Sequence, residues 1–274
     1  LLGPPEAAAA PFFEMLLEDE DPRFQALGLA GAARLRSSGC LKLVRALAER
    51  PFSAPEPAIS MSPLDANRWS LQFSALGVLA DWEGVKTLPL ILRRAKEAPA
   101  AAELAAALFW AEGFDRFVAW SESPKPSDQA LAARAWSAAA PPAALRATKD
   151  RLWALLLSRR GRETRHRAAV KLGLAAEEAD VDRLLVERGK AAEADTVLLD
   201  AALFASRHMK AAPLLVQYAK SSRDPLARAG ALLQLRSMLA TEDYRALLKW
   251  VLENDADGEN RANAAAELAA PQLK

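Results

Sequence analysis

The sequence predicts an all-α protein built from consecutive pairs of antiparallel helices. Alanine and leucine, which favour helices, dominate the 274 residues, whereas β-branched residues are sparse and only 2 tyrosines occur. Apolar residues recur with helical spacing from end to end, and Pro, Gly, Asp and Ser interrupt them at regular intervals. Two distant segments also share one pattern, which indicates a repeat.

The two similar segments each begin with Asp-Pro, carry an early arginine and continue as a helix rich in Ala, Leu and Gly. The first covers 21–35 and is followed by the turn SSGC and a Leu-rich helix at 41–50. The second covers 224–238 and is followed by ATED and a helix at 244–254. Asp at the N-cap accepts backbone N–H groups, and Pro is tolerated at the first helical position. We therefore predict a unit of two helices joined by a short turn.

The same rhythm fills the rest of the chain. First helices are expected at 65–80, 99–111, 127–139, 162–174 and 194–206. Second helices are expected at 84–97, 113–121, 142–158, 178–189 and 208–220, and a half-unit at 259–269 closes the chain.

These units resemble HEAT repeats in their Asp-Pro starts, early arginines and small residues where helices approach, such as Gly28 and Gly31. The tetratricopeptide and ankyrin signatures are absent. The resemblance implies a right-handed α-solenoid of about seven to eight helix pairs, in which stacking buries a continuous core. It covers nearly the whole chain, so a single domain over 1–274 is expected.

A proline-rich insertion at 51–64 (PFSAPEPAISMSPL) interrupts the repeats. Its four prolines disfavour a helix and favour extended segments. A surface loop lying over the first repeats is the favoured interpretation. The alternative is a docking segment for a partner, in which Phe52, Ile59, Met61 and Leu64 would be covered.

Motifs for catalysis are missing from the sequence. No phosphate-binding G-x-x-x-x-G-K-[ST] or G-x-G-x-x-G, no H-E-x-x-H and no G-x-S-x-G occurs. The two histidines, His166 and His208, belong to different units, and Cys40 has no nearby histidine. We therefore expect a non-catalytic protein without cofactor or metal. A single cysteine fits a reducing compartment, so a cytoplasmic location is favoured, but a chain that starts without Met also fits a processed secreted form.

Arginines crowd the segment 159–167, which holds five of them and one histidine. Arg159 and Arg160 would end one helix, where cations are favourable, and Arg165 matches the early arginine of the repeat. The favoured interpretation is therefore structural. The alternative is an anion site, because guanidinium groups suit phosphates and carboxylates; its further members would be Arg162 and His166.

The predicted second helices with their flanking charges sum to +10, whereas the remaining residues sum to −9 within a net charge of +1. In a HEAT-like solenoid the second helices line the concave surface, so we expect that surface to be basic. Two tryptophans, Trp153 and Trp250, fall beside the core stripes of their helices. The candidate partner-binding residues are Arg93, Arg94, Lys149, Trp153, Arg159, Arg160, Arg162, Arg165, His166 and Trp250.

The favoured function is a scaffold that binds an acidic protein or peptide on this surface. One competing function is that of a DNA-binding protein of the alkylpurine glycosylase type that some HEAT-like proteins represent, although a net charge of +1 weakens it. The chain would also suit a structural subunit of a larger assembly, and a chromophore lyase is the least favoured function. No apolar run is long enough to span a membrane.

Overall fold

A computed structural model describes residues 9–52, 54–56 and 61–270, and these residues form helices joined by short turns, without a strand. The prediction of an all-α protein is confirmed. The chain divides into two compact units, Leu1–Thr148 and Lys149–Lys274, and each is described by itself.

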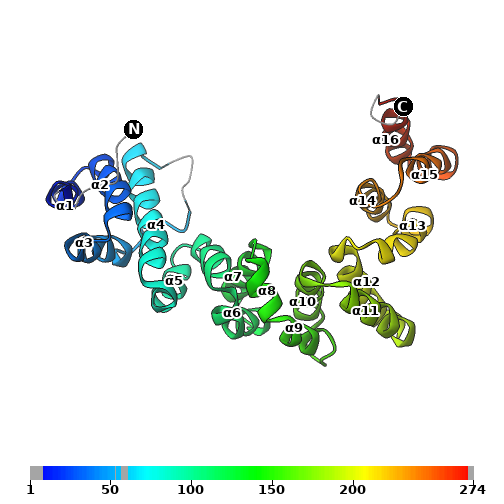
Figure 1. Ribbon diagram of the computed structural model, residues 1–274, viewed down its shortest axis with the longest axis horizontal. Helices are drawn as coiled ribbons and strands as arrows, with labels where there is room; N and C mark the ends of the chain where they lie inside the picture. The colour runs from blue at the N-terminus through cyan, green and yellow to red at the C-terminus, as the bar shows by residue number, and fades with distance from the viewer. Residues whose placement is uncertain (1–8, 53, 57–60, 271–274) are drawn as a thin grey trace. The chain divides into compact units, whose positions relative to one another are not determined.

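In the first unit each helix packs mainly on the helices next to it in the chain (Figure 1). Thus α1 contacts α2 and α3, α2 and α3 both contact α4, and α6 contacts α5, α7 and α8. The helices are α1 (Ala10–Glu18), α2 (Pro22–Leu35), α3 (Ser38–Glu49), α4 (Pro63–Glu83), α5 (Leu88–Ala95), α6 (Ala100–Glu122), α7 (Pro126–Ser137) and α8 (Pro142–Ala147), with a 3₁₀ turn, η2 (Gly84–Thr87), between α4 and α5.

The second unit follows the same rule. Helix α10 contacts α9 and α12, α13 contacts α14 and α15, and α16 contacts α14 and α15. The helices are α9 (Lys149–Leu156), α10 (Arg162–Ala175), α11 (Glu178–Lys190), α12 (Glu193–Ser206), α13 (Ala212–Ser221), α14 (Pro225–Leu235), α15 (Thr241–Asn254) and α16 (Gly258–Ala269), with a 3₁₀ turn, η3 (Met209–Ala211), before α13. We call α10, α12, α14 and α16 first helices, and α9, α11, α13 and α15 second helices.

Most expected helices are present within a few residues of their predicted bounds, with three differences. Helix α1 was not predicted. The helices expected at 99–111 and 113–121 form the single element α6, which is kinked at Phe109 (φ −134°, ψ 45°). The helix expected at 142–158 is instead two, α8 and α9, separated at Thr148, whose hydroxyl accepts a hydrogen bond from the Trp110 indole N–H at 2.9 Å.

Small residues let helices approach closely in both units. A Cβ added to Gly28 of α2 would lie 2.8 Å from the Leu17 backbone nitrogen of α1, so the close packing expected at Gly28 is confirmed. In the second unit, a Cβ on Gly173 of α10 would lie 2.2 Å from the Ala202 carbonyl oxygen of α12. Contacts this short exclude any larger side chain without a backbone shift.

The fourth residue of several helices ties the helix to the end of the one before it. Its side chain donates a hydrogen bond to a carbonyl at or just after the end of the preceding helix, which would otherwise lack a partner. The donors and acceptors are Gln25 to Leu17 (3.1 Å), Gln129 to Ser123 (3.1 Å), Arg165 to Leu156 (2.9 Å), Arg228 to Ser222 (2.7 Å) and Arg261 to Asp255 (2.6 Å).

This position corrects one equivalence drawn from the sequence. The early arginines of the two Asp-Pro segments are not equivalent, because Arg23 is the second residue of α2 whereas Arg228 is the fourth residue of α14. Arg23 is exposed and pairs with its own N-cap, Asp21, at 2.6 Å. Gln25 occupies the position that corresponds to Arg228. Both aspartates do cap their helices as predicted, Asp21 by accepting from the Arg23 backbone N–H and Asp224 from that of Leu226.

The described part of the insertion lies on the first unit. The Phe52 ring is 5.4 Å from that of Trp69, whose indole N–H donates to the Ala54 carbonyl at 3.1 Å. Glu56 is paired with Arg134 of α7. This bears out the surface-loop interpretation for residues 51, 52 and 54–56. Pro63 and Leu64 belong to α4 instead, and Ile59 lies outside the described residues.

Candidate partner-binding groove

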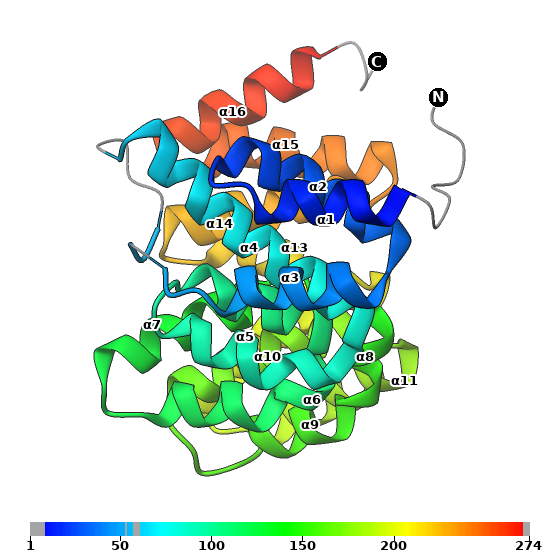
Figure 2. The ribbon, with the colours of Figure 1, turned by 90° about the vertical axis from the view of Figure 1, so that its left-hand side faces the viewer.

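A groove of about 740 Å³ runs between α13 and α15 in the second unit. Figure 2 shows the two helices, with α13 in yellow and α15 in orange. One wall comes from η3 and α13, and the other from α15 and the loop before it. The lining residues are Met209, Ala212, Pro213, Val216, Lys220, Leu239, Asp243, Ala246, Leu247 and Trp250.

The spacing of these residues explains why they share one face. On α15 they recur at Asp243, Ala246 and Trp250, and on α13 at steps of three and four residues, so each set forms a stripe along its helix. Ala212 and Leu247 are buried and form the floor, whereas Pro213 and Ala246 are exposed along the sides. The walls are therefore apolar along most of the groove.

Trp250 lies at one end of the groove and is only partly buried. The Lys220 ammonium lies 5.2 Å from the centre of its ring, a cation–π distance. Lys220 is exposed, so its charge is accessible beside the indole face. An aromatic surface next to a cation is a combination common at protein-binding hot spots.

Asp243 stands toward the opposite end, in the first turn of α15. It is exposed and supplies the negative charge among the lining residues. Near a helix N-terminus a carboxylate is stabilised by the backbone N–H groups. The groove thus has an apolar middle, a cation beside Trp250 and an anion at its other end.

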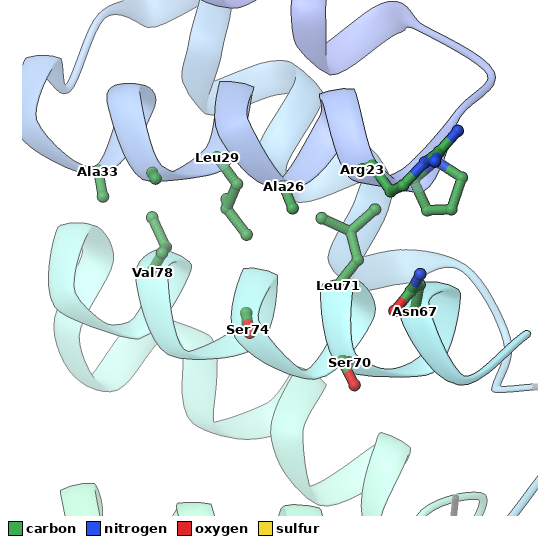
Figure 3. A pocket seen from close by; sticks show the side chains of 11 residues that line it. Arg23, Ala26, Leu29, Ala33, Asn67, Ser70, Leu71, Ser74 and Val78 are labelled. Atoms are coloured by element: carbon green, nitrogen blue, oxygen red, sulfur yellow. The ribbon is translucent and has the colours of Figure 1, made fainter. Parts of the chain in front are cut away.

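A second groove, of about 530 Å³, lies between α2 and α4 in the first unit. Figure 3 shows Leu29 of α2 and Leu71 and Val78 of α4 pointing toward one another across it. Its remaining lining is mostly alanine and serine, with no aromatic side chain. Its charged side chain, Arg23, is occupied by Asp21, whose carboxyl pKa this pairing lowers to about 2. This groove has fewer features that could select a partner.

The arginine-rich segment is divided by the structure. Arg165 donates to the Leu156 carbonyl and pairs with Asp195 of α12 at 2.8 Å, and Arg167 pairs with Glu163 at 2.8 Å. These two arginines hold helices together, as the structural interpretation expected. The exposed members of the segment are Arg159, Arg160, Arg162 and His166.

Three other candidates are engaged within the protein. Arg94 is buried, pairs with Glu97 at 2.8 Å and donates to the Glu49 carbonyl. Lys149 pairs with Asp180 at 2.9 Å, and this hydrogen bond raises the pKa of the lysine.

The indole of Trp153, expected on a flank, is 3% exposed. Its N–H donates to Asp180 at 3.3 Å, and the Arg183 guanidinium covers the ring at 4.1 Å. Neither Arg94 nor Trp153 can offer its side chain to a partner, which corrects both assignments; Arg93 is exposed on α5.

Trp250 is the predicted residue that lies in the α13/α15 groove. The sequence did not identify its neighbours Met209, Val216 and Lys220, which belong to the preceding second helix. Comparing the flanks of successive second helices would have found them, because Lys220 and Trp250 both follow the core stripe of their helix.

Chemistry and membrane insertion find no support in the described part of the chain. No group of three or more His, Cys, Asp and Glu side chains there could hold a metal ion. No described helix is long and apolar enough to cross a membrane. No protein-family model matches the chain, and no curated protein matches it in sequence.

Proposed function

We propose that this protein is a non-catalytic scaffold that binds a protein or peptide partner in the groove between α13 and α15. The observation that carries the proposal is the partly buried Trp250 with Lys220 beside it, at one end of an apolar groove. Such a groove can bury apolar side chains of a partner, while the charges at its ends orient the partner.

The architecture behind the proposal is a HEAT-like α-solenoid. Each described helix contacts mainly its neighbours in the chain, and the hydrogen bond from the fourth residue recurs at positions 25, 129, 165, 228 and 261. The separation between positions 129 and 165, and that between 228 and 261, each correspond to about one two-helix unit. In such a fold, successive second helices form an extended surface suited to binding.

A pull-down with matched groove variants tests this function. The Val216→Arg protein places a charged side chain in the α13/α15 groove, and the Ser74→Arg protein does the same in the α2/α4 groove. We expect quantitative mass spectrometry to show a partner retained by the wild-type and Ser74→Arg proteins and lost by Val216→Arg. A partner retained equally by all three, or lost only by Ser74→Arg, would overturn the proposed site.

A further inference from the structure

We infer that the occupant of the α13/α15 groove is an amphipathic helix that lies antiparallel to both walls, with acidic residues in its first turn and basic residues in its last. The inference rests on the proposed function and specifies the partner's chemistry and direction. It follows from three properties of the groove: the direction of its walls, the order of its charges and the state of its backbone groups.

The two walls run in the same direction. Lys220 is near the end of α13 and Trp250 is in the last part of α15, and these two side chains are in contact. Met209 precedes α13, Asp243 lies in the first turn of α15, and both line the same groove. The beginnings of the two helices therefore share one end of the groove, and their later parts share the other.

Parallel walls give the groove an electrostatic direction. The helix dipoles make the end at Met209 and Asp243 positive from backbone N–H groups, and the end at Lys220 and Trp250 negative from carbonyl groups. A third helix is most stable between such walls when its own dipole is reversed. It therefore places its first turn beside Lys220 and its last turn beside Asp243.

The charged side chains select the same direction for a particular partner. Acidic residues in a helix's first turn stabilise that helix, and so do basic residues in its last turn. In the antiparallel arrangement the acids meet Lys220 and the bases meet Asp243. A helix that is stabilised by its own end charges is therefore also the one that complements the groove.

The walls favour a helix over an extended peptide. Both walls are helical, so most of their backbone N–H and C=O groups are already paired within each helix. An extended segment would lie against Ala212, Val216 and Leu247 with its own backbone groups unpaired, which is unfavourable. A helix pairs its backbone internally. The span from Met209 to Lys220 matches about three helical turns.

Selection from a displayed peptide library tests the inference on the full chain. The library has an apolar stripe at helical spacing, end positions that vary among Glu, Lys and Ser, and a matched set in which central prolines forbid a helix. We expect enrichment of proline-free peptides with Glu in the first turn and Lys in the last. Enriched peptides should lose binding to Val216→Arg and keep binding to Ser74→Arg.

A charge exchange in the groove supplies the decisive arm. In the Lys220→Glu/Asp243→Lys protein, we expect the preference between a selected peptide and its end-reversed version to invert, by about fivefold in dissociation constant, because exposed pairs are weak. Both peptides carry a hydrocarbon staple so that they stay equally helical. Enrichment of proline-containing or oppositely charged peptides, or an unchanged preference, would overturn the helix inference but keep the groove. The absence of any binding sensitive to Val216→Arg would contradict the proposed function itself.

Discussion

The first helices and the second helices of the second unit meet their neighbours in opposite ways. Between first helices, charged side chains fill the contact: Arg165 bridges α10 to α12, and Arg228 of α14 holds the buried Asp255 that precedes α16. Between the second helices α13 and α15 the surface stays open, with apolar walls and Trp250. Buried, paired charges close the first contact, whereas exposed apolar surface leaves the second available to a partner.

The largest expected effect comes from breaking the closed contact. Arg228 and Asp255 are both buried and joined by two hydrogen bonds of 2.6 and 2.8 Å. Replacing Arg228 with Met leaves Asp255 as a buried carboxylate without its main partner, which should lower the free energy of unfolding by about 3–5 kcal/mol. Urea denaturation measures this. The control is Arg23→Met, the other arginine that follows an Asp-Pro start, which should change stability by less than about 0.5 kcal/mol. Equal losses in the two variants would remove the distinction between these positions.

This pair shows what the sequence can and cannot predict. The helices and the Asp-Pro caps follow from local preferences, so they were predicted. The roles of Arg23 and Arg228 differ by two positions on a helix, and this difference decides which arginine faces a neighbouring helix. Trp153 looked available for the same reason: its burial depends on Asp180 and Arg183, which belong to another helix. Contacts between units are not encoded in any single segment.

Filling the open groove should have the next largest effect, on binding and not on folding. Val216 is half-buried at the centre of the groove, so Val216→Arg places a charge where apolar side chains of the partner would pack. We expect a selected peptide to bind about 100-fold more weakly, the range of a hot-spot loss. Fluorescence anisotropy measures the dissociation constant. Unfolding free energy should change by less than about 1 kcal/mol, and a peptide that binds Val216→Arg normally would show that it lies elsewhere.

Lys171 provides a contrasting test within the first helices, because burial opposes its charge. The side chain is 3% exposed, and burial lowers the pKa of its ammonium group to about 8 from 10.5. Between these values the unfolded chain binds more protons than the folded one, so stability should rise as pH increases from 8 to 10. The penalty is complete below pH 8, and Lys171→Met should relieve about 2–3 kcal/mol there.

Denaturation of both proteins across this pH range checks the sign. The difference between Lys171→Met and the wild type should shrink as the pH approaches 10. A substitution that destabilises the protein at pH 7, or a difference that does not change with pH, would show that Lys171 is compensated in the folded state.

The smallest effect is expected at the arginine-rich turn. Arg159 and Arg162 are exposed there, so Arg159→Glu/Arg162→Glu should change stability by less than about 0.5 kcal/mol and leave peptide binding unaltered. A gel-shift titration with random duplex DNA over a range of salt concentrations completes the test. Salt-sensitive DNA binding that this variant abolishes would favour a nucleic-acid function.

Amide hydrogen exchange on the full chain, with and without the best selected peptide, tests the central claim most directly. We predict that protection appears in 209–220 and 239–250, and that 158–167 and the walls of the α2/α4 groove exchange as in the free protein. Protection centred on 158–167 or on α2 and α4, with 209–220 unchanged, would contradict the claim that the partner binds between the second helices.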